Sequence, residues 1–343
     1  MKTQFIKADP ETFDAECLAE PADFIRNGGL VAFPTETVYG LGADGTNDSA
    51  VKKIFEAKGR PQNNPLILHF AQIDDCAQYA ECDCRFYSLA EAFMPGPLTV
   101  VLPSKGKCAP SVTAGLDSVA VRVPIHPVAR ELIRSSGRPI AAPSANLSGR
   151  PSPTTAEHVI ADLDGKADAI IDGGACSVGL ESTIVKLDKN GATLLRPGGI
   201  TLEMLRSVLG EVTVAPEVLA PPEPGAVPLS PGMLLKHYAP KAPLYLVRSE
   251  HENDLIVFFN EAAKVSDNAV ICFNGYGPNQ PNVYFLGERE DESEHARRLF
   301  DLLRLADKNG AARIYAPMPK RDGMGLALQN RMLRAAAFRI KDL

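Results

Sequence analysis

The sequence predicts an α/β protein of two domains, and three observations carry that prediction. Short β-rich apolar runs alternate with helical patterns over the first 214 residues, a proline-rich stretch follows, and a second α/β pattern begins after it. The chain of 343 residues is long enough for two domains, at a prior of one per ~150 residues. We therefore expect an N-terminal domain over 1–214, a linker over 215–242 and a C-terminal domain over 243–343.

Seven runs in the N-terminal domain have the apolar and β-branched character of strands. They lie near residues 30, 65, 98, 118, 139, 169 and 182, as in LVAFPT, LTVVLP and SVAVRVP. Between the first two, NDSAVKKIFEAKG predicts a helix that Asn47 or Asp48 caps and that ends at Gly59. The alternation favours a large twisted mixed β-sheet with flanking helices.

The stretch 215–232 holds six prolines, a density that neither a helix nor a central strand can sustain. We expect it to run extended and fairly stiff. Beyond it, PLYLV, NAVICF, NVYFLG and ARIYAP are typical of strands, and LALQNRMLRAAAFRI predicts a terminal amphipathic helix. One apolar helical stripe is formed by Ala296, Leu299, Phe300 and Leu303. The second domain is therefore predicted to be a smaller Rossmann-like or flavodoxin-like α/β unit.

Composition excludes several classes of protein. With 45% hydrophobic and 23% charged residues the chain is globular, and a net charge of −6 gives no support to a nucleic-acid coat protein or a binder of anionic membranes. The N-terminal segment lacks the continuous apolar region of a signal peptide, and no window approaches the ~18 apolar residues of a spanning helix. We expect a cytoplasmic protein without a membrane partner.

The seven cysteines are an odd number scattered through the chain, which disfavours a disulfide framework. Cys76, Cys82 and Cys84 could supply three thiolates to zinc. A closed zinc site needs four ligands, however, and no fourth cysteine or histidine lies nearby. We therefore expect free thiols and no protein-bound metal.

The segment GLGADG at residues 40–45 matches the G-x-G-x-x-G pattern of dinucleotide-binding proteins. That reading needs the first glycine directly after a strand, a helix that starts between the second and third glycines, and an acid at the end of the next strand. Here residues 34–39 lie between the strand and the first glycine, the predicted helix cap follows the third glycine, and the next strand ends at His69 and Phe70. NAD or FAD binding is therefore disfavoured.

Polar clusters follow several predicted strands, where α/β proteins gather groups that bind ligands. Lys58 and Arg60 either grip phosphates or simply compensate the end of a helix. Arg122 lies in an apolar strand and needs a carboxylate, from the protein or from a ligand. His69 ends a strand, where a histidine is more often structural than catalytic. The loop AAPSANLSGRPSPT, which is rich in hydroxyl and amide groups, either surrounds a nucleotide or is an ordinary capped loop.

In their order and spacing these clusters resemble the YrdC/Sua5 family in its long two-domain form. The segments that carry the resemblance are FPTETVYGLG, KGRPQNNPLILH, AVRVP, PSANLSG, ESTIV, LRPG and SPGMLLKHYAP, which span residues 33–240. The resemblance implies a nucleotidyltransferase that joins L-threonine, bicarbonate and ATP into threonylcarbamoyl-AMP and releases pyrophosphate. The product would supply a tRNA threonylcarbamoyl transferase machinery that modifies position 37 of ANN-decoding tRNAs; whether tRNA contacts this chain is left open.

The resemblance also assigns expected roles to residues. Lys58 and Arg60 are the expected catalytic pair at the phosphates, and Mg²⁺ is implied by the triphosphate with no protein ligand named. Two departures from relatives occur: Ser118 replaces a threonine, and 234–235 replace a basic residue and a tyrosine. L-Threonine would be held by Thr37, His69, Arg122, the backbone of Ala142, and Ser182, and ATP by Arg60, Asn64, Ser118, Ser144, Asn146, Ser152, Arg196 and Tyr238.

The segment SPGMLLKHYAP, at 230–240, is expected to fold as a lid on the N-terminal pocket, with Tyr238 on ATP and Lys236 and His237 nearby. Deleting it should then cost activity more than stability. Two other functions compete with the synthase. A YrdC-like module that only binds RNA would show steep salt dependence, and a carbamoyl transferase of the hydrogenase-maturation type would need zinc-finger and acylphosphatase segments that are absent from the sequence.

Overall fold

The computed structural model describes residues 2–221 and 237–343. Most of the predicted lid, including Lys236, lies outside these residues. The described chain divides into two compact units, one made of 2–148 with 152–218 and the other of 149–151 and 219–221 with 237–343. Each unit contains one β-sheet. Within the described ranges, no helix combines the length and the apolar character that crossing a bilayer requires.

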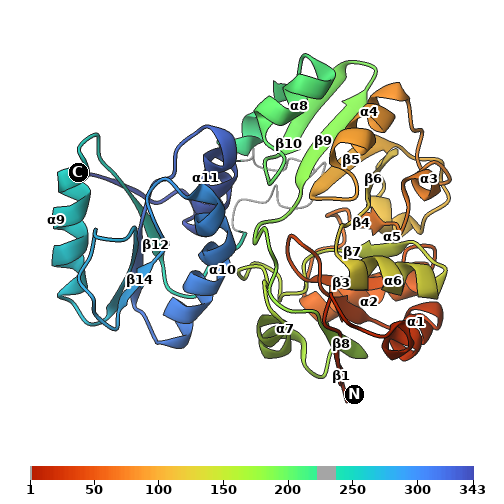
Figure 1. Ribbon diagram of the computed structural model, residues 1–343, viewed down its shortest axis with the longest axis horizontal. Coiled ribbons are helices and arrows are strands. Elements are labelled where there is room, and N and C mark those ends of the chain that lie inside the picture. The colour runs from red at the N-terminus through yellow and green to blue at the C-terminus, as the bar shows by residue number, and fades with distance from the viewer. Residues whose placement is uncertain (1, 222–236) are drawn as a thin grey trace. The chain divides into compact units, whose positions relative to one another are not determined.

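The first unit is built on a mixed sheet of eleven strands, as predicted (Figure 1). Both parallel and antiparallel neighbours occur, and the short central strands are buried throughout. In sheet order the strands are β1 (Gln4–Lys7), β8 (Ala169–Asp172), β2 (Val31–Phe33), β3 (Gly40–Asp44), β7 (Ile140–Ala142), β4 (Ile67–His69), β6 (Ser118–Arg122), β5 (Leu98–Pro103), β9 (Thr183–Asp188), β10 (Gly191–Arg196) and β11 (Thr213–Val214).

Helices flank this sheet, and the burial of their apolar stripes forms the core. Ile25 and Leu132 pack in one cluster with Val31, Phe33 and Ile140 of the sheet. The helical segments are η1 (Ala15–Leu18), α1 (Ala19–Arg26), α2 (Asp48–Lys58), α3 (Ile73–Cys76), α4 (Cys84–Phe93), α5 (Pro110–Thr113), α6 (Pro127–Ser136), α7 (Ala156–Leu163), α8 (Leu202–Leu209) and η2 (Pro216–Val218).

Helix α2 has the predicted ends. The side chain of Asn47 accepts a hydrogen bond from the amide of Ala50, and Gly59 takes a left-handed conformation with φ of 60°. A side-chain acceptor at the start and a left-handed glycine at the end satisfy backbone groups that the helix leaves open. The helix thereby delivers Lys58, its last residue, and Arg60 to the same corner of the unit.

The GLGADG segment is a strand, which the sequence analysis did not predict. Gly40 to Asp44 form β3, which pairs antiparallel with β2. A Cβ atom on Gly42 would lie 2.5 Å from Cγ2 of Ile140 and 2.8 Å from Cε1 of Phe33. These glycines therefore make room for packed side chains and cradle no phosphate, because a backbone paired in a sheet cannot also form a phosphate-binding turn.

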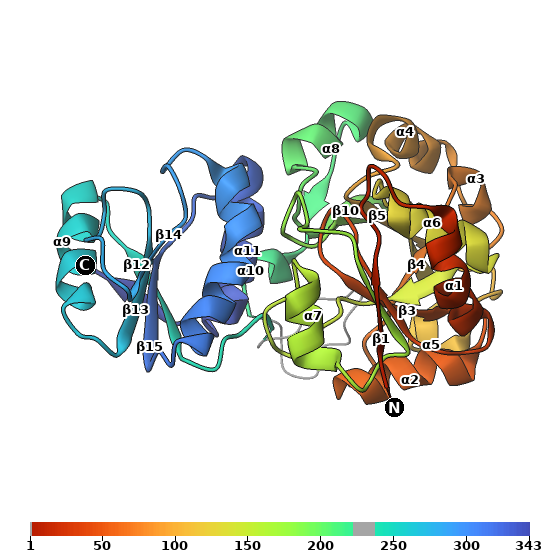
Figure 2. The ribbon, with the colours of Figure 1, turned by 60° about the horizontal axis from the view of Figure 1, so that its bottom comes forward.

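The second unit is a parallel sheet with the strand order β14 (Val283–Phe285), β13 (Asn268–Cys272), β15 (Arg313–Pro317), β12 (Leu244–Arg248) and β16 (Ile340–Asp342). Helix α9 (Glu252–Ala263) covers one face, and α10 (Glu292–Lys308) and α11 (Gly323–Ala335) cover the other (Figure 2). Parallel strands with helices on both faces confirm the predicted Rossmann-like or flavodoxin-like character.

The predicted end of the terminal helix was wrong. The pattern placed the helix over 326–340, whereas α11 ends at Ala335. Ala337 and Phe338 have φ angles of 47° and 59°, a left-handed conformation that a right-handed helix cannot continue through. The chain then returns to the sheet, where Ile340 begins the short strand β16.

Candidate active site

Sheet register brings His69 and Arg122 together. These residues end the adjacent parallel strands β4 and β6 and are partners in the register. On the other side of β4, Ala142 is the register partner of Ile67 in the antiparallel strand β7. Three residues that the family resemblance assigned to L-threonine thus lie on three neighbouring strands. Their roles remain predictions.

Arg122 has a protein carboxylate as its partner. Its Nη2 atom donates to Oε1 of Glu36 at 2.7 Å, and both side chains are 5% exposed. Its Nε atom donates to the Gly96 carbonyl at 3.4 Å. The Nη1 atom and Glu36 Oε2 have no hydrogen-bond partner among the described residues. The buried pair therefore leaves one donor and one acceptor for a ligand.

Glu36 is the residue that sequence reasoning missed. It lies inside the PTETVYGLG motif, directly after the loop from β2, and only its neighbour Thr37 was singled out. The available signal was the strand arginine itself, because a buried guanidinium needs a carboxylate. Nothing in the sequence indicated which of the 42 acidic residues supplies it.

His69 is held neutral in the native protein. Burial and the positive charge of Arg122 lower the pKa of its imidazole from 6.5 to about 3. The Nδ1 atom lies 3.1 Å from the Ile67 carbonyl and 3.3 Å from the Ile140 carbonyl. Because carbonyl oxygens only accept, Nδ1 carries the proton and Nε2 keeps its lone pair. The side chain therefore presents an acceptor beside a cation.

This neutral histidine predicts a pH dependence of stability. The unfolded chain binds a proton near pH 6.5 and native His69 does not, so its contribution, complete above pH 6.5, is lost as the pH falls toward 3. The free energy of unfolding should fall by up to about 1.4 kcal/mol per pH unit below that value. Urea unfolding of wild type and His69→Gln across this range measures the effect. An equally steep fall in the variant would contradict it, because the comparison isolates His69 from the other titrating groups.

Thr37 lies in a loop fixed by hydroxyl groups. Thr35 donates its hydroxyl to the Val38 carbonyl at 2.6 Å, and the Thr37 hydroxyl lies 2.8 Å from the Thr35 hydroxyl oxygen. The amide of Thr37 also donates to that oxygen. Since the Thr35 proton is used on Val38, Thr37 donates its own and retains acceptor lone pairs.

Hydrogen bonds join the ESTIV segment to the LRPG segment. Arg196, the last residue of β10, donates from Nε to the Ser182 carbonyl at 3.0 Å and from Nη2 to the Ser182 hydroxyl at 3.2 Å. That hydroxyl also lies 2.7 Å from the hydroxyl of Thr99. A Cβ atom on Gly198 would approach the Thr183 nitrogen to 2.5 Å, so only glycine allows this contact. Ser152, assigned to ATP, donates its hydroxyl to Glu181 of the same segment.

Lys58 organises the loop that follows β7. Its ammonium group donates to the carbonyl oxygens of Ser144, at 2.6 Å, and Asn146. The hydroxyl of Ser144 lies 2.5 Å from the side-chain oxygen of Asn146. Lys58 is 3% exposed, which fits a structural anchor for the loop as well as a nearby phosphate. Its predicted catalytic role remains a prediction.

Arg60, Asn64 and Ser118 gather at the other ends of β4 and β6. The guanidinium of Arg60 donates to the carbonyls of Asn64 and Pro65 at 3.3 and 3.2 Å. The Asn64 side chain is fully buried, and neither amide atom has a hydrogen-bond partner in the described part of the chain. A buried amide without partners costs free energy unless a ligand satisfies it.

The candidate residues thus form two groups joined by the short central strands. The first group lies toward the starts of β4 and β6 and contains Lys58, Arg60, Asn64, Ser118 and the Ser144 loop. The second group is formed by His69 and Arg122 at the ends of the same strands. A strand the length of β6 spans roughly 13 Å at 3.3 Å per residue. A nucleotide joined to an amino acid is long enough to reach both groups.

Tyr238 is a buried residue of the second unit. Its ring lies 5.5 Å from that of Phe300 and 4.1 Å from that of His237, and the guanidinium carbon of Arg331 lies 5.6 Å from the ring centroid. Its φ angle of 64° is rare for an aromatic residue and stores backbone strain. The predicted contact with ATP remains a prediction.

The metal prediction can be compared with the side chains present. Within the described ranges, no group of three or more histidine, cysteine, aspartate or glutamate side chains could hold a metal ion. All seven cysteines are free, and Cys76 is buried whereas Cys84 is exposed. Mg²⁺ therefore remains a prediction that follows from the triphosphate and names no protein ligand.

Comparisons with known proteins identify the family of this chain. The Sua5_yciO_yrdC family model, described as telomere recombination, matches residues 23–198, and the model of the threonylcarbamoyl-AMP synthase C-terminal domain matches residues 200–337. Threonylcarbamoyl-AMP synthases of Pyrococcus abyssi and Bacillus subtilis are 45% and 44% identical, over 93% and 94% of this chain and 94% of each relative. The structure of P. abyssi Sua5 with L-threonine superposes with a TM-score of 0.92 at 42% identity, covering 99% of this chain and 100% of that one. The chain therefore belongs to the threonylcarbamoyl-AMP synthase family, in its two-domain Sua5 form.

Proposed function

We propose that this protein is an L-threonylcarbamoyladenylate synthase, which joins L-threonine, bicarbonate and ATP and releases pyrophosphate. The observation that carries the proposal is the buried pair of Arg122 and Glu36 beside neutral His69. Relatives named for this activity, and a related structure that contains L-threonine, support it. A cation, a carboxylate and a neutral acceptor at one point match the carboxylate, ammonium and hydroxyl groups of an amino acid.

In the proposed complex, Nη1 of Arg122 donates to the carboxylate of threonine, and Ser182 and Thr37 border the same end of the sheet. The acceptors Glu36 Oε2 and His69 Nε2 face the amine and the hydroxyl. Because His69 stays neutral, it adds no positive charge that would repel the ammonium group of the substrate. These residues position the amine for reaction and take no covalent part in it.

The reaction then balances in two steps. The threonine ammonium group first loses a proton to solvent, the free amine and bicarbonate then form a carbamate and water, and a carbamate oxygen attacks the α-phosphate of ATP while the bond to pyrophosphate breaks. Arg60, in the group with Lys58 and Asn64, would stabilise the negative charge on the departing pyrophosphate, and Arg196, beside Ser182, would bind ATP from the threonine end of the site. Mg²⁺ bound to the triphosphate would neutralise part of the same charge. The Asn64 amide would bind the nucleotide, and Lys58 would hold the neighbouring loop in place.

We also propose that the product passes to a tRNA threonylcarbamoyl transferase machinery and that the protein works in the cytoplasm, where its free cysteines would stay reduced.

Pyrophosphate release from ATP tests the proposed reaction. Release should require both L-threonine and bicarbonate, and mass spectrometry should detect threonylcarbamoyl-AMP. Release that continues when either substrate is omitted would overturn the proposal. RNA affinity with a steep salt dependence and no ATP turnover would instead support the RNA-binding alternative.

A further inference from the structure

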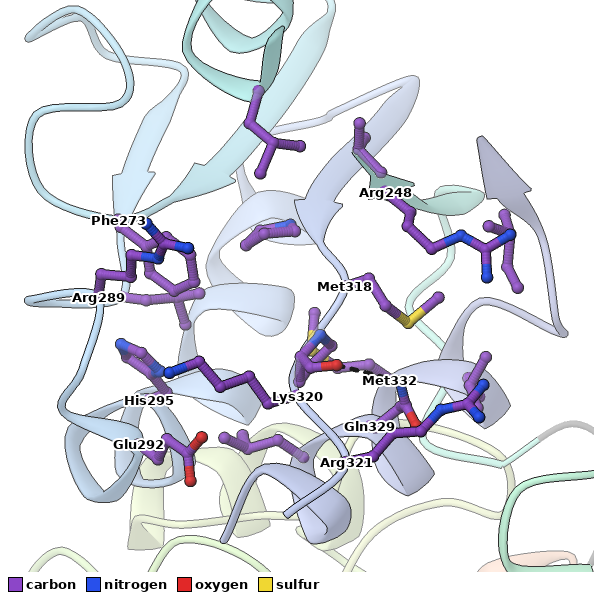
Figure 3. A pocket seen from close by; sticks show the side chains of 18 of the residues that line it. Arg248, Phe273, Arg289, Glu292, His295, Met318, Lys320, Arg321, Gln329 and Met332 are labelled. Carbon is purple, nitrogen blue, oxygen red and sulfur yellow. Dashed lines mark hydrogen bonds between the residues drawn. The ribbon is translucent and has the colours of Figure 1, made fainter. Parts of the chain in front are cut away.

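A cavity of about 480 Å³ lies in the second unit and takes no part in the reaction proposed above (Figure 3). It opens at the carboxyl ends of four parallel strands. Val247 lines it from β12, Phe273 follows β13, Leu286 follows β14, and Pro317 ends β15. Cavities of roughly 300–1,000 Å³ are typical of sites for small molecules.

The connections of the sheet place this cavity at a point where ligands bind in related folds. From β13 the chain continues toward one edge of the sheet, to β14. From the neighbouring strand β15 it continues toward the other edge, to β16. Loops that diverge from adjacent parallel strands leave a crevice at the carboxyl edge, and open α/β sheets bind ligands there. The location is therefore favourable independently of the side chains.

Four cationic side chains line the cavity: Arg248, Arg289, Lys320 and Arg321. Figure 3 shows Arg289 on one side and Arg248 and Arg321 on the other, with Lys320 between them. Arg321 forms no ion pair with any residue that the structure describes. The other three pair with acids whose side chains are 48–72% exposed. Such surface pairs are worth at most about 1 kcal/mol, so a phosphate can displace them.

Inside the cavity, two buried side chains present acceptors. Gln329 is 4% exposed; its Nε2 atom donates to the Pro319 carbonyl at 3.0 Å, and its Oε1 atom has no partner among the described residues. The Nε2 atom of His295 lies 2.8 Å from the carbonyl oxygen of Glu288. Because a carbonyl only accepts, Nε2 carries the proton and Nδ1 remains an acceptor. The one acid of the lining, Glu292, accepts from the Gly325 amide. A ligand that fits must therefore bring an N–H or O–H donor into an apolar interior.

We propose that this cavity is a second nucleotide site, separate from the site of the reaction, that takes a nucleotide with an amino-bearing base. The base would lie against Phe273 and the apolar walls, its exocyclic amine would donate to Gln329 Oε1, and its phosphates would bind the cations at the rim. Aromatic stacking and charge-assisted hydrogen bonds supply the affinity. Inorganic phosphate would leave the apolar interior empty, and a fatty acid would leave Gln329 without a donor.

The number of ADP molecules bound per chain tests this proposal. Equilibrium dialysis of the full-length protein with labelled ADP should give two sites, of which one is lost in Arg321→Glu. Arg321 is exposed, so this change does not threaten the fold. Arg313→Glu is the matched control, because Arg313 begins β15 and lies at the opposite edge of the sheet. Binding of two ADP molecules should persist in that control.

A second variant examines the base. Gln329→Leu should weaken binding of ADP at the second site by about tenfold, the loss of one hydrogen bond, and leave the binding of pyrophosphate there unchanged. One ADP per wild-type chain that Arg321→Glu still binds, or two per chain of Arg321→Glu, would overturn the inference; one ADP that Arg321→Glu loses would support the second site and count against ADP binding at the reaction site. Dialysis needs neither threonine nor turnover, so a failure here is distinct from a failure of threonine-dependent pyrophosphate release.

Discussion

Arg122→Ala is expected to abolish threonine-dependent release of pyrophosphate. The guanidinium is the buried cation at the end of β6, and its Nη1 atom is the donor left over from its pair with Glu36. Without it the carboxylate of threonine would enter a site that holds an unpaired glutamate, and attraction would become repulsion. A charged hydrogen bond is worth about 1.5–3 kcal/mol, and the repulsion adds to its loss, so turnover should fall by at least about a hundredfold.

The fold of this variant needs its own control. Removing one partner of a buried ion pair costs about 3–5 kcal/mol because the other charge is left unpaired. The double variant Arg122→Gln with Glu36→Gln removes both charges and should recover most of the stability without recovering activity. Arg134→Ala, in an exposed pair on α6, should match wild type in both properties. If folded Arg122→Ala keeps an activity near that of wild type, Arg122 does not bind the carboxylate of threonine.

Regular patterns in the sequence were enough to predict the architecture. Runs such as LTVVLP and STIVKL became β5 and β9, and the caps of α2 lie where Asn47 and Gly59 were expected. The strand β3 was not predicted from the sequence because its glycines by themselves match no strand pattern. They are explained by the packing of Phe33 and Ile140 against them, and such contacts join residues distant in sequence.

The two sites differ in how far the sequence could predict them. The first site is built from short continuous segments that each join a strand to a loop, so its motifs can be recognised in the sequence. The partner of Arg122 was still not predictable, because the pairing of Glu36 depends on the path of the loop after β2. The cavity of the second unit is lined by single residues at the ends of four strands and in the loops after them, such as Arg248 at the end of β12 and Arg321 in the loop after β15, and no local sequence motif predicts it. Its position follows from the strand order, which only the structure provides.

Tyr238→Ala is expected to lower the free energy of unfolding of the second unit by about 3–5 kcal/mol, as for other buried aromatic residues. The ring packs against Phe300 and beneath Arg331, and alanine would forfeit both contacts. This changes the expectation for deleting 230–240. The deletion removes a buried ring, so it should cost stability as well as activity, and lost turnover after deletion would not by itself demonstrate a lid.

Tyr238→Phe separates the two roles, because it keeps the ring and removes only the hydroxyl group. If that hydroxyl contacts ATP, the variant should unfold within about 1 kcal/mol of wild type while its KM for ATP rises about fivefold or more, the value of one hydrogen bond. Steady-state pyrophosphate release with ATP varied at saturating threonine measures the change. An unaltered KM would show that the hydroxyl does not bind the nucleotide. The strained φ angle of 64° would then have to be explained by the packing of the ring alone, since a bulky residue keeps such a conformation only where its surroundings impose it.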